Sequence, residues 1–349
     1  MPQTAPSGHQ NLLGADRSCY IMWKSVCCEV QGTGHKKNHV PCQDKTFELI
    51  QNGVHVIALA DGAGSASLSH YGAQRVVQDV SEYLAAHFHE CLNCDDGRKV
   101  KQDLLEMIRN SLSEEAQVRE CSIRDLSSTL LLAAVDEDNF ILAHIGDGVI
   151  GYLDGDKLKI ASIPDNGEFS NETTFVTSGE ALSSMRLFKG ELKNKDGFVL
   201  MSDGTEQSLY HKQSKSLASV IVKLMHRTCL IDSGTMKAQL KDAFTAVIAK
   251  NTQDDCSIAI LARPSAMLCS IDTLGFKERQ ELYGIGGEQR CVRKRVNRCD
   301  MILAIAETPC SLMQIARKVH LRPKYARKHI NRLISLGLLS KKGNQYQKI

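Results

Sequence analysis

Short apolar runs of strand length recur through the first 262 residues, and they limit the possible folds more than any other feature of the chain. The runs are rich in Val, Ile, Leu and Ala, and they lie at residues 54–60, 129–135, 140–146, 149–153, 197–202 and 256–262. Each run predicts a β-strand. Between them, apolar residues recur at helical spacing around residues 76–88, 104–112, 217–224 and 240–248. Consecutive strands with short links and paired helices favour an α+β layered sandwich over a strict βαβ alternation.

The composition is that of a globular protein large enough for two domains. The chain has 349 residues, of which 42% are apolar and 24% are charged. No run of about 18 apolar residues is present, so we expect no membrane span. The polar N-terminus, "MPQTAPSGHQNLLGADRS", lacks the apolar core of an export signal. The 13 cysteines are scattered through apolar segments, which favours reduced thiols and a cytoplasmic protein.

The net charge of +3 conceals two parts of opposite sign. Residues 276–349 contain 17 Lys and Arg against 5 Asp and Glu, a net charge of +12. The remaining residues contain 26 basic and 35 acidic side chains, a net charge of −9. An acidic body joined to a basic tail suggests two different kinds of partner.

Aspartates fall at the ends of the predicted strands. Asp61, Asp147 and Asp203 each follow a strand and are each followed by glycine, while Asp254 opens the last strand and Asp44 precedes the first. A single Asp-Gly is commonly no more than a turn. Several acids at corresponding strand ends repel one another unless a cation compensates, and hard oxygen ligands select Mg²⁺ or Mn²⁺ over zinc. The glycine beside each acid allows close approach of backbone, water or substrate.

An ordered set of short motifs carries a resemblance to a known family. "ADGAG", "SSTL", "HIGDG", "MSDG" and "DDCS", in this order, resemble the metal-dependent serine/threonine protein phosphatases of type 2C. The opening "GTGHKKNHVPCQD" is similar to that of a bacterial branch of this family. The resemblance covers roughly residues 20 to 262 and implies a catalytic domain at 19–264. It also implies a four-layer α-β-β-α sandwich with a two-metal centre at one end.

The resemblance assigns the direct ligands of two Mn²⁺ or Mg²⁺ ions. Asp61 matches the aspartate that bridges both ions, and Gly62 matches the residue whose carbonyl binds one of them. Asp203 and Asp254 match the other direct aspartate ligands.

Further residues match positions around those ions. Asp44 matches an acid that acts through bound water, and Asp147 matches an acid that helps to hold a third, looser metal in many bacterial members. Ser128 and Thr129 match a structural motif beside the site.

The chain departs from the family pattern at three places. An arginine often grips the phosphate upstream of the first acid, where this chain has His35, with Lys36 or Lys37 as alternatives. Gln43 stands where a glutamate often lies, and Asp255 replaces the usual asparagine after the last ligand. None of these changes removes a direct metal ligand, so we expect an active enzyme.

The expected reaction is hydrolysis of phosphoserine and phosphothreonine in proteins. A water activated by two metals would attack phosphorus in line, without a covalent phosphoenzyme. His35 or a metal-bound water could protonate the leaving oxygen. One alternative is a DNA-binding transcriptional regulator whose phosphatase-like domain is a sensor with little turnover. Another is hydrolysis of a small phosphate ester or nucleotide, for which the metal centre would be the same.

The basic tail resembles a winged helix-turn-helix domain at residues 292–349, joined by a linker at 265–291. The pattern predicts three helices, with Ser311 as a cap, followed by a small hairpin. One predicted helix face carries the residues expected to enter the major groove of DNA, namely Lys324, Arg327, Lys328 and Asn331. Lys341 and Lys342 would then contact phosphates. A solvated basic face or a protein-docking domain is the alternative interpretation.

One cysteine-rich segment has only part of a metal-binding pattern. "HFHECLNC", residues 87–94, has half the ligand spacing of a zinc finger, and we expect a helix end with buried thiols instead. No heptad or other self-association pattern predicts an oligomeric state.

Overall fold

The computed structural model describes residues 23–164, 173–263, 274–287, 289–336 and 338–348. The first residues of the predicted catalytic domain, 19–22, lie outside these ranges. So does the first part of the predicted linker, 265–273.

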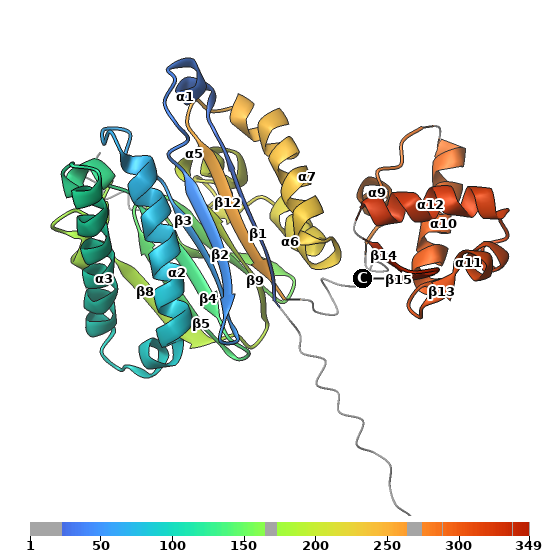
Figure 1. Cartoon of the computed structure of the whole chain (residues 1–349), viewed down its shortest axis with the longest axis horizontal. Helices are drawn as coiled ribbons and strands as arrows, with labels where there is room; N and C mark the ends of the chain where they lie inside the picture. The colour runs from blue at the N-terminus through green and yellow to red at the C-terminus, as the bar shows by residue number, and fades with distance from the viewer. Residues whose placement is uncertain (1–22, 165–172, 264–273, 288, 337, 349) are drawn as a thin grey trace, which may run out of the picture.

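Two five-stranded antiparallel sheets form the centre of the larger part (Figure 1). The first sheet has the order β2-β3-β4-β5-β8, with β2 (Lys45–Gln51), β3 (Val54–Ala60), β4 (Leu130–Val135), β5 (Asn139–Ile145) and β8 (Arg186–Glu191). The second sheet has the order β1-β12-β9-β6-β7, with β1 (Lys24–Val30), β12 (Cys256–Ala262), β9 (Lys195–Met201), β6 (Val149–Asp154) and β7 (Lys157–Ser162). Every pair of neighbours runs antiparallel.

Helix pairs cover the outer faces of both sheets. α2 (Ser69–Asn93) and α3 (Gly97–Val118) lie on the first sheet, and α6 (Val220–Leu230) and α7 (Ser233–Ala246) lie on the second (Figure 1). The layers are therefore helix, sheet, sheet and helix, as expected. The shorter elements are α1 (Thr33–Lys37), η1 (Ile123–Leu126), α4 (Ala181–Ser184), α5 (Asp203–Leu209), η2 (Ile248–Lys250), β10 (Tyr210–His211) and β11 (Ser216–Leu217).

The central strands are apolar throughout because both of their faces are covered. In β3, Val56 and Ala58 face the core shared with α2 and α3, whereas Ile57 and Leu59 face the other sheet. Successive side chains in a strand point to opposite faces, so a strand between two layers needs apolar residues at every position. All seven residues of β3 are buried.

The predicted strands are confirmed, with ends that shift by one or two residues. One predicted helix, 217–224, is partly wrong because Leu217 pairs with Tyr210 in a two-stranded hairpin before α6 begins. Helix α7 also ends earlier than its apolar pattern indicated. Ile248 belongs to the 3₁₀ turn η2, and Val247 is 58% exposed.

The basic tail contains one more helix than the sequence predicted. The elements are α9 (Phe276–Leu282), α10 (Gln289–Ile305), β13 (Cys310–Ser311), α11 (Leu312–Lys318), α12 (Pro323–Ser335), β14 (Leu339–Lys342) and β15 (Gln345–Lys348). α9 lies inside the predicted linker. This segment is folded because Leu282 and the following Tyr283 are buried in a core with α10. Lys223 on α6 lies 3.5 Å from Glu278 on α9. The strands form a small sheet in the order β13-β15-β14.

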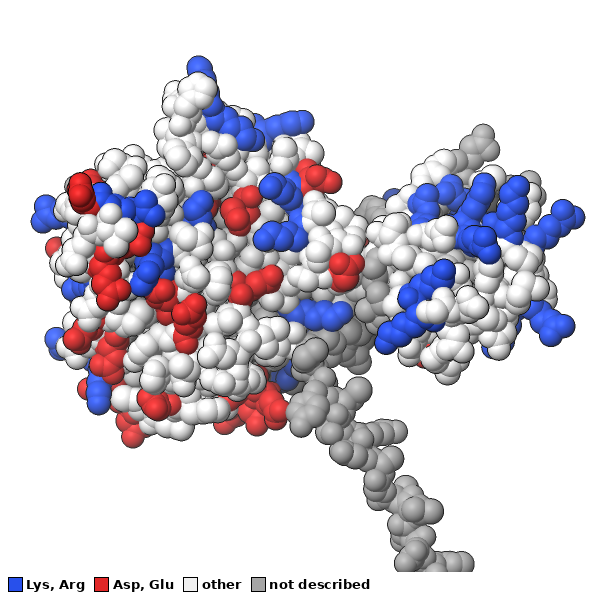
Figure 2. Space-filling model, in the orientation of Figure 1, with Lys and Arg blue, Asp and Glu red and all other residues white. Residues whose placement is uncertain are grey.

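The two faces of α12 differ in polarity as predicted. Ala326, Ile330 and Leu333 are fully buried against the rest of the tail. The opposite face is exposed, and it consists of Lys324, Arg327, Lys328 and Asn331. Figure 2 shows Lys and Arg gathered over this part of the molecule. Ser311 caps α11 with a reciprocal bond to Gln314, as its position in the sequence predicted.

The structure also bears on the membrane, cysteine and zinc-finger expectations. No described helix is both long and apolar enough to cross a membrane. None of the eleven cysteines among the described residues forms a disulfide bond. Residues 87–94 lie at the end of α2, where Cys91 is buried, so the helix-end interpretation of this segment is confirmed.

Candidate active site

Strand register brings the predicted acids to one end of the sandwich. In the first sheet, Lys45 pairs with Ala60, so Asp44 and Asp61 lie side by side just beyond the paired strands. In the second sheet, Met201 pairs with both Val149 and Ile258, and these pairs place the segments carrying Asp147, Asp203 and Asp254 at the same end. Asp147 lies in the short connection between β5, in the first sheet, and β6, in the second sheet.

Hydrogen bonds to two neighbouring segments hold the loop after β3 in place. The Asp61 amide donates to Thr129 Oγ1 at 2.9 Å, and the Thr129 amide donates to the Asp61 carbonyl at 2.8 Å. Gly62 forms an isolated bridge with Ser128, and its amide donates to the Gln43 carbonyl at 3.3 Å. The Ser-Thr motif therefore fixes the direction in which Asp61 leaves the strand.

Glycine after Asp61 and Asp203 serves chain packing. A Cβ at Gly62 would lie 2.8 Å from the Ser69 side chain at the start of α2. A Cβ at Gly204 would lie 2.1 Å from the Asp255 carbonyl oxygen, which is too close for any side chain. Asp203 therefore starts α5 directly against the segment that carries Asp254.

Burial and repulsion from neighbouring acids raise the pKa values of Asp44, Asp61 and Asp203. The Asp61 pKa lies well above its ordinary value because the carboxyl is buried and because Asp44, Asp203, Asp254 and Asp147 surround it. Burial is also the main cause of a raised Asp203 pKa, about 6, with Asp254 and Asp147 adding to it.

Asp44 is the most enclosed member of the cluster. It is 1% exposed, and neither of its carboxylate oxygens has a hydrogen-bond partner among the described residues. Burial raises its pKa to about 7, and the nearby Ser202 and Ser257 hydroxyls offset only part of that rise. A buried carboxylate with only two hydroxyl groups near it, neither at hydrogen-bond geometry, is disfavoured unless a cation lies close to it.

These donors fit hard divalent cations. Within the described ranges, no group of three His, Cys, Asp or Glu side chains is arranged to hold an ion by itself. Mg²⁺ commonly takes one or two carboxylates and completes its coordination with waters. A cluster of buried and mutually repelling carboxylates, one of them without any hydrogen bond, has the chemistry that such ions require.

Asp255 joins three segments behind the acids. Its carboxylate accepts the Gly32 amide at 2.7 Å and the Gln43 amide at 2.6 Å, and it is 1% exposed. His35 Nδ1 lies 2.9 Å from Asp255 Oδ2, an ion-pair distance without hydrogen-bond alignment. The departure from the usual asparagine thus places a full charge where two backbone donors and an imidazole meet.

His35 lies at the edge of the cluster. Its Nε2 is 3.9 Å from Asp254 Oδ1, and the side chain is 20% exposed. Lys36 and Lys37 follow it in α1 and are exposed. The fold therefore brings His35 to the acids, and it leaves the two lysines at the surface.

Several polar residues near the acids had no sequence signal. Thr173 Oγ1 donates to Asp147 Oδ2 at 2.7 Å. Lys212 Nζ lies 2.6 Å from Glu206 Oε1, one turn along α5 from Asp203, and Glu206 is 2% exposed. In the sequence, the glutamate at the fourth position of α5 is the only hint of the pair between Glu206 and Lys212.

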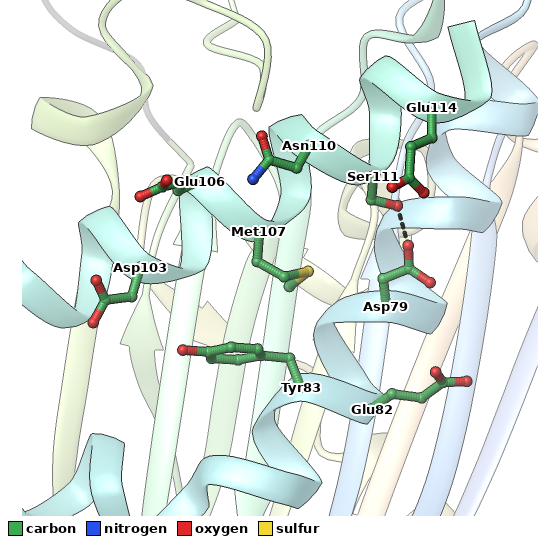
Figure 3. Close-up of a pocket in the computed structure, with 9 residues that line it drawn as sticks. All are labelled: Asp79, Glu82, Tyr83, Asp103, Glu106, Met107, Asn110, Ser111 and Glu114. Carbon is green, nitrogen blue, oxygen red and sulfur yellow. Dashed lines mark hydrogen bonds between the residues drawn. The ribbon is translucent and has the colours of Figure 1, made fainter. Parts of the chain in front are cut away.

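A separate acidic hollow lies between α2 and α3 (Figure 3). Glu82, Asp103, Glu106 and Glu114 line it, and the Ser111 hydroxyl donates to Asp79 in the same hollow. None of the predicted site residues lines it, so it is distinct from the acid cluster.

Comparisons with known proteins identify the family of the chain. The profile of the family described as "Protein phosphatase 2C" matches residues 31–245. "Serine/threonine-protein phosphatase 3" from Escherichia coli (strain K12) is 30% identical over 174 residues, which cover 48% of this chain and 68% of that protein.

Comparison with solved structures also finds bacterial serine and serine/threonine phosphatases. A single-residue variant of a bacterial serine phosphatase is 16% identical and covers 70% of this chain and 99% of its own, with a TM-score of 0.50. Serine/threonine phosphatase Stp1 from Staphylococcus aureus is 14% identical, covers 70% of this chain and 96% of its own, and has a TM-score of 0.49.

The chain therefore belongs to the protein phosphatase 2C family, since the family profile spans more than half of its length. It is accordingly a serine/threonine protein phosphatase.

The hydrogen bonds of Asp255 give the first prediction. Asp255→Ala leaves the Gly32 and Gln43 amides without an acceptor, a loss of roughly 3 kcal/mol. Removal of the charge also relieves repulsion on Asp44, so we expect a net destabilisation of about 2 kcal/mol, measured by urea unfolding. Asp242→Ala, at an exposed acid on α7, should change stability by less than about 0.5 kcal/mol. Equal stabilities of the two variants would contradict the role of Asp255.

Proposed function

We propose that the acid cluster hydrolyses phosphoserine and phosphothreonine esters of protein substrates with two bound Mn²⁺ or Mg²⁺ ions. The observation that carries this proposal is the set of carboxylates that meets at one end of the sandwich, where Asp44 is buried and has no hydrogen-bond partner among the described residues. Such a set keeps its full negative charge at neutral pH only beside positive charge.

The family resemblance supplies the proposed ligands. Asp61 would contact both ions, the Gly62 carbonyl would contact one of them, and Asp203 and Asp254 would be the remaining direct ligands. Asp44 would act through a bound water, and Asp147, oriented by Thr173, would support a third ion.

The side chains around the ions would position the substrate and move a proton. Two divalent cations supply an acidified water and neutralise charge on the phosphoryl group. His35 has one ring nitrogen against Asp255 and the other toward Asp254, so Nε2 is the atom we assign to protonating the leaving serine or threonine oxygen. Lys36 and Lys37 are the nearest predicted cations for the phosphate.

Phosphate release tests the proposal directly. Phosphoserine and phosphothreonine peptides should release phosphate with Mn²⁺ or Mg²⁺ and not with chelator. Asp203→Asn should lower kcat/KM by at least about 100-fold, because it removes a charged ligand. Glu106→Gln, in the separate acidic hollow, should retain full activity.

Absence of release from a folded protein that still binds Mn²⁺ would contradict the proposal. That result would favour the alternative, a DNA-binding regulator whose phosphatase-like domain acts as a sensor.

We further propose that residues 292–349 form a winged helix-turn-helix domain that binds DNA. Three helices followed by the β14–β15 hairpin support this proposal. α12 would enter the major groove through Lys324, Arg327, Lys328 and Asn331, and the exposed Lys341 and Lys342 of the hairpin would contact phosphates. Use of the same face for a protein partner is the alternative.

The salt dependence of DNA binding tests the face on α12. The double variant Arg327→Ala/Lys328→Ala should weaken duplex binding and reduce the slope of log K against log salt by about 0.9 for each phosphate that the variant no longer neutralises. Lys99→Ala, at an exposed lysine on α3, should leave both quantities unchanged. An unchanged slope in the double variant, measured by fluorescence anisotropy, would refute the assignment of this face.

We also propose a cytoplasmic location. The described cysteines form no disulfide bonds, which supports this proposal. Reduced thiols persist in the cytosol, whereas secreted proteins commonly pair them.

A further inference from the structure

An apolar groove lies between α5, α6 and α7, beside the acid cluster. It encloses about 580 Å³. Leu209, Leu240 and Phe244 are buried residues that line it. Val220 and Val247 also line it, and they are 40% and 58% exposed. Two large apolar side chains that no described segment covers are unusual at the rim of such a groove.

The groove adjoins a polar hollow that reaches Asp254. This second hollow encloses about 840 Å³ and is lined by His35, Asp254, Asn38 and Thr252 among others. Gln207 and Asn251 line both spaces, and the two adjoining spaces together are called the trough. The trough has a polar half at the acid cluster and an apolar half beyond it.

Helix α5 sets the length of the trough. It begins at Asp203, inside the acid cluster, and ends at Leu209, inside the apolar groove. Six helical steps span about 9 Å. An extended peptide covers that distance in roughly three residues.

A polypeptide is the occupant whose chemistry matches both halves. The amides of Gln207 and Asn251 and the Thr252 hydroxyl suit hydrogen bonds to a peptide backbone. The apolar half suits an aliphatic or aromatic side chain. A small phosphate ester would fill the acid end alone.

We propose that this groove is a specificity subsite for an apolar side chain about three residues from the phosphorylated residue of a protein substrate. The inference rests on the proposed function, because it takes the acid cluster as the place where the phosphate binds. Val220 and Val247, at the rim of the groove, contact the apolar side chain of the substrate and so determine the preference for it. Neither residue belongs to the acid cluster.

Peptide pairs provide the test. The two phosphothreonine peptides of a pair would differ at one position, which is leucine in one peptide and serine in the other. Across the pairs this position would lie two to four residues before or after the phosphorylated residue. The full-length protein with Mn²⁺ should prefer leucine at about the third position on one side, by roughly tenfold in kcat/KM. In Val247→Ser that preference should disappear. The ratio of leucine-peptide turnover to p-nitrophenyl phosphate turnover should also fall below the ratio of the natural protein.

Two further variants keep the test interpretable. Val220→Ser changes the other rim residue and should act in the same way. Val118→Ser, at a valine that is 78% exposed on the distant α3, should keep the natural preference.

Each other outcome overturns the inference in a distinct way. Hydrolysis of p-nitrophenyl phosphate without any leucine preference would reject the subsite and leave the proposed function intact. A preference that persists in both rim variants would place specificity elsewhere. Concentration-dependent dimerisation that Val247→Ser abolishes, with no peptide preference, would assign the groove to a second copy of the chain. Absence of turnover on every substrate would reject the proposed function, and the subsite with it.

Discussion

Mutual repulsion among clustered carboxylates is the constraint on which the rest of the structure depends. Asp44, Asp61 and Asp203 lie at one end of the sandwich, with pKa values raised by burial and by neighbouring acids. This arrangement costs folding free energy, and the apolar core between the two sheets must offset that cost. A divalent cation at the cluster removes the repulsion, so the residues that destabilise the folded chain are the ones suited to bind a catalytic ion.

The antiparallel sandwich delivers these acids from distant parts of the chain. Strand ends that pair in the sheets carry the acids to one place, and Asp255 ties the loops behind them together. Its bonds to Gln43 and Gly32 join residues 212 and 223 positions apart in the sequence. A short set of hydrogen bonds thus fixes His35 and Asp44 relative to Asp254. The trough along α5 adjoins this end of the sandwich.

The sequence predicted the strands and the acids, because both depend on local patterns. A strand buried on two faces appears as an apolar run, and Asp61, Asp147 and Asp203 follow such runs directly. Features that depend on tertiary contacts escaped prediction. Leu217 fits a helical pattern but pairs in a hairpin, and Val247 fits a core pattern but lies at the surface. Helix α9 was missed because its short apolar pattern is completed by Tyr283 and α10.

Thermal unfolding with and without Mn²⁺ tests most directly whether the acid cluster is a cation site. The natural protein should gain about 3 kcal/mol at 100 times the dissociation constant, or roughly 5–10 °C in Tm. Asp61→Asn should be at least as stable as the natural protein without metal, since repulsion is relieved, and should gain little from Mn²⁺. Glu106→Gln should respond as the natural protein does. An equal rise in Tm for Asp61→Asn and the natural protein would contradict the account.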